Sequence, residues 1–89
     1  MAFSLKAARE NKNMFDQAMK LWKASGYDPA DTPRGGASVH KNFLKPYYDF
    51  VIKQMTIDFP DIPHDRVRGQ VMKAKTKIYS AWVRGRDNG

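Results

Sequence analysis

The side chains best suited to chemistry in this sequence are cations, and they are concentrated in its last third. Residues 66–89 contain seven basic residues and one acidic residue, whereas residues 46–65 contain one basic residue and four acidic ones. If this last third is helical, at about 100° per residue, its cations lie on two flanks of an apolar stripe. One flank carries Arg66, Lys73, Lys77 and Arg84, and the other carries Arg68, Lys75 and Arg86.

The first flank, from Arg66 to Arg84, is a row of cations about 27 Å long. Such a row suits a polyanion, because it can neutralise several phosphates of a duplex at once and release their counterions. Nucleic acid, with DNA favoured over RNA, is the first partner that this charge predicts. An anionic membrane surface or an acidic protein fits the same charge. The structural alternative is that the aliphatic parts of these Lys and Arg side chains only cover the edge of the hydrophobic core. The expected phosphate contacts are Arg66, Arg68, Lys73, Lys75, Lys77 and Arg84.

Two adjacent tyrosines, Tyr47 and Tyr48, are the aromatic candidates for the same surface. On a helix they point about 100° apart, so they cannot both be fully buried on one face. Stacking on a base or insertion into a groove is the functional interpretation. Core packing with the hydroxyl group at the surface is the structural one, and it is the simpler of the two.

No constellation of catalytic or metal-binding residues stands in the sequence. Cysteine is absent, and the two histidines, His40 and His64, are too few for a structural zinc site. A chain of 89 residues builds one modest core, which disfavours a deep substrate cleft. We therefore expect no catalytic residue, no metal, no cofactor and no enzymatic activity.

The elements that must position these side chains are predicted to be helices, in an all-α single domain over residues 1–89. Apolar residues recur at helical spacing, and no alternating strand pattern is present. The expected helices span about 5–25, 46–58 and 63–83. Residues 26–37 are rich in glycine and proline and are expected to be a loop or hinge, and residues 85–89 are expected to be a mobile tail.

The helix boundaries follow from local signals. Ser4 suits an N-cap and Gly26 suits the position after a helix C-cap. Pro46 and Pro63 suit the first helical position, and each disfavours a helical conformation in the residue before it. The two tryptophans, at the ends of their apolar stripes, are expected in the core.

Within residues 46–75 the sequence resembles an HMG-box domain, most of all the YABBY type. The resemblance rests on Pro46, Tyr47, Tyr48 and Phe50, followed by the run from Pro60 to His64. The segment between Phe50 and Pro60 is about one turn shorter than in that family, and the family's long third helix is not matched. The resemblance implies insertion of apolar side chains into the minor groove and DNA bending, with Tyr47, Tyr48 and Phe50 near the wedge.

The leading interpretation is a small, basic, sequence-tolerant DNA-binding protein in a reducing intracellular compartment, such as the nucleus, the cytoplasm or a virion, with a mitochondrial location as a further option. No run of about 20 apolar residues is present, so no transmembrane segment is expected. The alternative is a structural or accessory subunit of a large assembly, such as a virion, a ribonucleoprotein or a respiratory complex. That alternative predicts that the helix over 5–25 packs on a partner and not in a core of its own.

Overall fold

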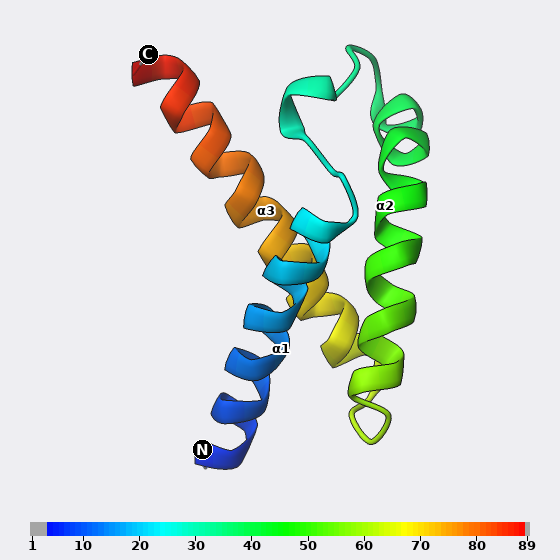
Figure 1. Cartoon of the computed structure of the whole chain (residues 1–89), viewed down its shortest axis with the longest axis vertical. Helices are drawn as coiled ribbons and strands as arrows, with labels where there is room; N and C mark the ends of the chain where they lie inside the picture. Colours follow the sequence, from blue (N-terminus) through cyan, green and yellow to red (C-terminus); the bar gives the residue numbers. More distant parts are fainter. Residues whose placement is uncertain (1–3, 89) are drawn as a thin grey trace.

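The computed structural model describes residues 4–88 and contains three α-helices within that range, with no strand. They are α1 (Leu5–Ala24), α2 (Ala37–Asp58) and α3 (His64–Asn88), and a short 3-10 helix, η1 (Pro29–Asp31), precedes α2. In Figure 1, α1 and α3 cross near their middles while α2 stands beside the crossing. The predicted all-α, three-helix fold is confirmed.

The first helix has the boundaries that its end signals predict. The Ser4 hydroxyl accepts a hydrogen bond from the Ala7 N–H at 3.2 Å, which satisfies one of the free amides of the first turn. At the other end Gly26 has a φ of 87°, a left-handed conformation that glycine adopts without strain. The chain therefore leaves α1 through the expected glycine turn.

The connection between α1 and α2 differs from the expected glycine- and proline-rich loop, because part of it is folded onto the core. Asp28 caps η1 by accepting a hydrogen bond from the Ala30 N–H at 2.9 Å. Tyr27 and Pro29 are buried, and the Tyr27 ring meets Trp22 edge-on at 5.1 Å. Such packing anchors the connection and leaves little of a free hinge.

The second helix begins at Ala37, nine residues before the predicted start at Pro46. Pro46 lies inside α2, where it removes one backbone hydrogen bond and would be expected to end the helix. Its own side chain is exposed, but Phe43 and Leu44 pack against the core from the preceding turn. Burial of that turn offsets the local preference, so the boundary predicted at Pro46 is wrong.

The third helix begins within one residue of its predicted start and runs beyond its predicted end at 83, to Asn88. Residues 85–88, assigned to the tail, are therefore helical, and Gly89 lies outside the described residues. Within this extension the Arg86 guanidinium lies 4.9 Å from the centre of the Trp82 ring, one turn earlier. In Figure 1 this end of α3 points away from the other two helices.

One cluster of buried side chains joins the three helices. At its centre is Trp22, fully buried, whose indole N–H donates to the Val71 carbonyl of α3 at 2.9 Å. The prediction that Trp22 lies in the core is confirmed. The same prediction for Trp82 is wrong, because Trp82 is half-buried and lies against Tyr79 at 5.7 Å, beyond the core. The core comprises Met14, Ala18, Trp22, Tyr27, Val51, Met55, Val67, Val71 and Ala74.

Candidate nucleic-acid interface

The two cationic flanks of α3 face different neighbours. On the first flank Arg66 and Lys77 contact side chains of α1. On the second flank Arg68 and Lys75 line a groove whose other wall is α2. The predicted phosphate contacts therefore belong to two separate surfaces, and α3 is the element that they share.

Arg66 is held by α1. Its guanidinium donates to the Asn11 amide oxygen at 3.0 Å, to a Glu10 carboxylate oxygen at 3.4 Å and to the Ala7 carbonyl at 3.5 Å. These bonds tie the start of α3 to the first half of α1, and they occupy donors that a phosphate would need. The structure thus gives Arg66 an intramolecular role that the sequence spacing did not predict.

Lys73, Lys77 and Arg84 form the free part of the first flank. All three are exposed, and none has an acidic partner among the side chains described, residues 4–86. The Lys77 ammonium lies 5.7 Å from the centre of the Phe15 ring of α1, where α1 and α3 meet. At about 1.5 Å per residue the three cations span roughly 16 Å. We call Lys73, Lys77 and Arg84 the basic row.

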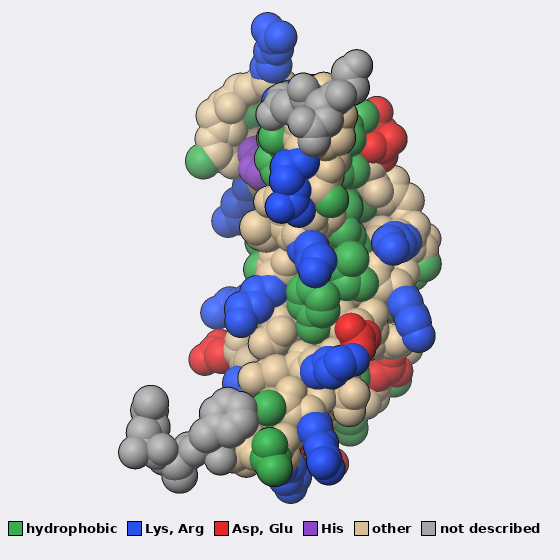
Figure 2. Space-filling view, turned by 90° about the vertical axis from the view of Figure 1, so that its left-hand side faces the viewer, with side chains coloured by type: hydrophobic (Ala, Val, Ile, Leu, Met, Phe, Trp, Pro, Cys, Tyr) green, Lys and Arg blue, Asp and Glu red, His purple; other side chains and the backbone are tan. Residues whose placement is uncertain are grey.

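Figure 2 shows the left-hand side of the molecule of Figure 1. A band of hydrophobic side chains runs down the upper and middle part of this face, and basic side chains lie on both sides of it. Acidic side chains are fewer than basic ones, and some of them lie just below the lower end of the band. The face is positively charged along its length, as a surface for an extended polyanion would be.

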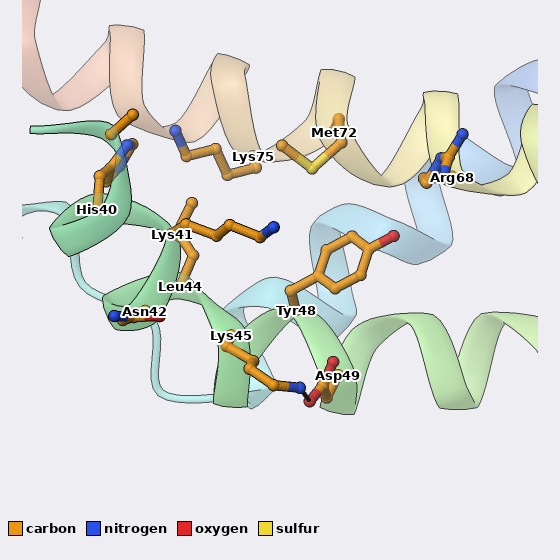
Figure 3. A pocket seen from close by; sticks show the side chains of 11 residues that line it. His40, Lys41, Asn42, Leu44, Lys45, Tyr48, Asp49, Arg68, Met72 and Lys75 are labelled. Atoms are coloured by element: carbon orange, nitrogen blue, oxygen red, sulfur yellow. Dashed lines mark hydrogen bonds and ion pairs between the residues drawn. The ribbon is translucent and has the colours of Figure 1, made fainter.

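The groove between α2 and α3 has a volume of about 730 Å³ and is open to solvent. Arg68 and Lys75 line it from α3, and Lys41 and Lys45 line it from α2. Figure 3 shows Lys41 and Lys75 between the two helices, whereas Lys45 points along α2 toward Asp49. Two of these cations have partners on their own helix: Lys45 pairs with Asp49 at 2.8 Å, and Arg68 with Asp65 at 3.4 Å. Its walls are formed by Ala37, His40, Lys41, Asn42, Leu44, Lys45, Tyr48, Asp49, Arg68, Met72 and Lys75.

Lys75 is buried, although the sequence analysis expected an exposed phosphate contact. Only 8% of its surface is exposed, and its ammonium lies 5.1 Å from the centre of the Tyr79 ring. Burial lowers the pKa of Lys75, since loss of hydration disfavours the charged form. Across the groove the Nε2 atom of His40 is also buried, and no group in the described part of the chain bonds to it.

The two tyrosines occupy different surroundings. Tyr47 joins a cluster of aromatic rings beside the core, with its ring centre 5.6 Å from that of Phe43 and 6.0 Å from that of Tyr27. Tyr48 lines the groove; burial raises its pKa, and the positive charge of Arg68 acts in the opposite direction. Both side chains are half-buried, so the structural interpretation describes them better than an exposed base-stacking surface does.

His40, Lys41 and Lys45 were missed by the sequence analysis because they precede Pro46, where no continuous helix was expected. A helix through Pro46 would have indicated them: Lys41, Lys45 and Tyr48 then lie at positions i, i+4 and i+7, on one side of α2. One wall of the groove could not be predicted, because the N-terminal part of α2 was expected to be a loop and not a helix.

Within residues 4–88, no three His, Cys, Asp or Glu side chains lie together in a way that could hold a metal ion. Across the same residues, none of the helices is both long enough and apolar enough to cross a lipid bilayer.

Comparison of the chain with protein-family models, with curated proteins and with solved structures gives no significant match. The resemblance of residues 46–75 to an HMG box stays a prediction.

Proposed function

We propose that the protein binds the phosphate backbone of duplex DNA, with little dependence on sequence, through one flank of α3 between Lys73 and Arg84. The observation that carries this proposal is the basic row: three exposed cations on one flank of a helix, none neutralised by an acidic partner within residues 4–86. Contacts to phosphates need only such charge and position, whereas contacts to base edges would specify sequence.

The distribution of acidic residues supports the same orientation. Asp58, Asp61 and Asp65 lie at or near the turn between α2 and α3, at the opposite end of α3 from Arg84. The molecule is therefore electrically polar along α3, and the field of the duplex would turn the basic end toward the DNA.

A salt titration of binding to linear duplex DNA tests the proposal. Affinity should fall steeply as salt rises, with a slope of about 0.9 in log–log units per phosphate contacted. The double variant Lys73→Ala/Lys77→Ala should flatten the slope by about 2 units. Absence of binding at low salt would overturn the proposal.

The matched control is Lys20→Ala/Lys53→Ala. It removes the same charge from exposed positions on α1 and α2, and neither lysine has an ion-pair partner in the described residues. Its slope should stay within about half a unit of the wild type, because these residues lie off the basic row. If Lys20→Ala/Lys53→Ala flattened the slope as much as Lys73→Ala/Lys77→Ala does, binding would depend on the net charge of the protein and not on the basic row of α3.

The HMG-type resemblance adds a proposal about DNA shape. Of the side chains that it places near a wedge, Tyr47 packs beside the core, whereas Phe50 is 48% exposed on α2. Phe50 is thus the side chain free to enter a minor groove. Cruciform DNA should then bind more tightly than linear duplex, and Phe50→Ala should reduce the preference. Equal affinity for both forms would discard bending and leave the electrostatic proposal standing.

Docking on a larger protein assembly is a second candidate function, and the structure changes where it would occur. The apolar stripe of α1 is not free for a partner, because Met14, Ala18 and Trp22 are buried in the chain's own core. The outward side of α2 instead exposes Val39, Phe50 and Ile57, with Ile57 61% exposed. These positions are eleven and seven residues apart, which places them on one side of a helix.

Two variants separate the candidates. Ile57→Ser should abolish co-sedimentation with a large assembly if docking is the function, and it should leave the salt dependence of DNA binding unchanged. If DNA binding is the function, Lys73→Ala/Lys77→Ala should flatten the salt dependence of DNA binding and should leave co-sedimentation with a large assembly unchanged. Hydrogen exchange of the isolated protein should show α1 protected in either case, because its stripe is internal.

A further inference from the structure

One end of the groove between α2 and α3 has the features of an anion site. The groove meets the N-terminus of α2, where Ala37 and His40 line it. Gly36, at the N-cap, provides no capping side chain, and no acidic residue stands in the first turn. The free amides and the positive end of the helix dipole are therefore not neutralised by the helix itself.

Two side chains at the same end of the groove also have no hydrogen-bond or ion-pair partner, although the Lys75 ammonium lies over the Tyr79 ring. Lys75, more than nine-tenths buried, forms no hydrogen bond or ion pair with any residue from 4 to 86. The Nε2 atom of His40 is buried and equally without a hydrogen bond. In Figure 3 the Lys75 ammonium points toward the end of the groove where His40 lies. The buried His40 nitrogen is costly to leave unpaired, and a bound anion would satisfy it and pair with the Lys75 ammonium at the mouth of a largely buried side chain.

The rest of the groove is suited to an organic group. Leu44, Tyr48 and Met72 supply apolar and aromatic surface, and Lys41 and Arg68 add positive charge along it. The volume of about 730 Å³ is within the range of small-molecule sites. A ligand here would combine an acidic group with an apolar or aromatic body.

We propose that this groove binds a small phosphate monoester with an aromatic or apolar organic group. The phosphate would lie between the N-terminus of α2, His40 and Lys75, and the organic group along Tyr48 and Met72. Phosphate fits better than carboxylate, since donors converge from a helix end, an imidazole and an ammonium group and so call for several acceptor oxygens. The site is separate from the basic row, which lies on the other flank of α3.

Amide chemical shifts of the ¹⁵N-labelled protein, followed by NMR during addition of phenyl phosphate, test the proposal. Shifts should be largest at residues 37–41, at Met72 and at Lys75, and inorganic phosphate and benzoate should each bind at least tenfold more weakly. Shifts confined to the basic row would overturn the proposal. Equal affinity for benzoate would overturn the assignment of phosphate, and equal affinity for inorganic phosphate would overturn the role of the organic group.

Two lysine variants provide the matched comparison. Lys75→Met keeps the length of the side chain, removes the buried charge and should weaken phenyl phosphate at least tenfold. Lys73→Met removes the same charge from the exposed flank and should change the affinity less than twofold. Thermal unfolding checks that both variants fold, and Lys75→Met should be about as stable as the wild type because methionine keeps most of the packing of the buried lysine stem. Unchanged affinity in folded Lys75→Met would overturn the site, whatever the result with DNA.

Discussion

The two tryptophans allow a direct test of which helix segments belong to the core. Trp22 is fully buried and donates a hydrogen bond to Val71, whereas Trp82 is half-buried beyond the core against Tyr79. Trp22→Phe removes the indole N–H and leaves a cavity where the second ring stood. The lost hydrogen bond is worth about 1 kcal/mol, and the cavity and lost burial add about 1 to 2 kcal/mol. The expected loss of unfolding free energy is therefore about 2 to 3 kcal/mol.

Urea and thermal unfolding followed by circular dichroism measure this loss. For a domain of this size, each kcal/mol shifts Tm by about 4 to 8 °C, so Trp22→Phe should lower Tm by roughly 10 to 20 °C. Trp82→Phe should cost less than about 1 kcal/mol, because only a partly exposed ring contact is weakened. The fluorescence of Trp22 alone should resist quenching by acrylamide, and that of Trp82 alone should not. Equal costs for the two variants would refute the assignment of Trp22 to the core and of Trp82 to a free helix end.

Three further substitutions test features of the fold. Arg66→Ala should lower the unfolding free energy by about 1 kcal/mol, because four hydrogen bonds to three acceptor groups of α1 are lost at a partly exposed site. The salt dependence of DNA binding should stay the same, and a flattened slope would instead make Arg66 a phosphate contact. Pro46→Ala should raise the unfolding free energy by about 1 to 3 kcal/mol, since an exposed residue inside α2 regains its backbone N–H. Chemical unfolding measures this change, and a lower unfolding free energy in the variant would contradict the prediction. Burial raises the pKa of Tyr27 to about 12, so the unfolded chain loses this proton from about pH 10 while the folded protein keeps it. Wild-type stability should fall between pH 10 and 12 more than that of Tyr27→Phe, as equilibrium unfolding at each pH would measure, and parallel curves would disprove the shift.

The helices were predictable where local signals and tertiary packing agree. Ser4 and Gly26 bound α1 as expected, and the apolar stripe expected between the two cationic flanks of α3 is present, with Val67, Val71 and Ala74 buried. At Pro46 they disagree: the local rule ends the helix, but packing of the preceding turn continues it. A sequence pattern reports local preference, and the burial that overrides it depends on residues distant along the chain.

The candidate site was predictable to the level of the helix but not to the level of the individual cation. Spacing alone placed the basic residues on two flanks of α3. It did not tell which flank meets which neighbour, and that decides whether a cation is free, as at Lys73, bonded, as at Arg66, or buried, as at Lys75. His40 entered the site only because α2 begins at Ala37.

The hydrogen bond from Trp22 to Val71 joins residues that are 49 positions apart in the chain. During synthesis α1 emerges first, and its main packing partner, α3, emerges last. Until then the stripe of Met14, Ala18 and Trp22 has Tyr27 of the connection and α2 to cover it, and the face that meets α3 is bare. Closing so long a loop costs chain entropy before the contact can repay it, which makes the meeting of α1 and α3 the expected late step of folding. The nascent chain would expose an apolar helix over that interval, and chaperones recognise such surfaces.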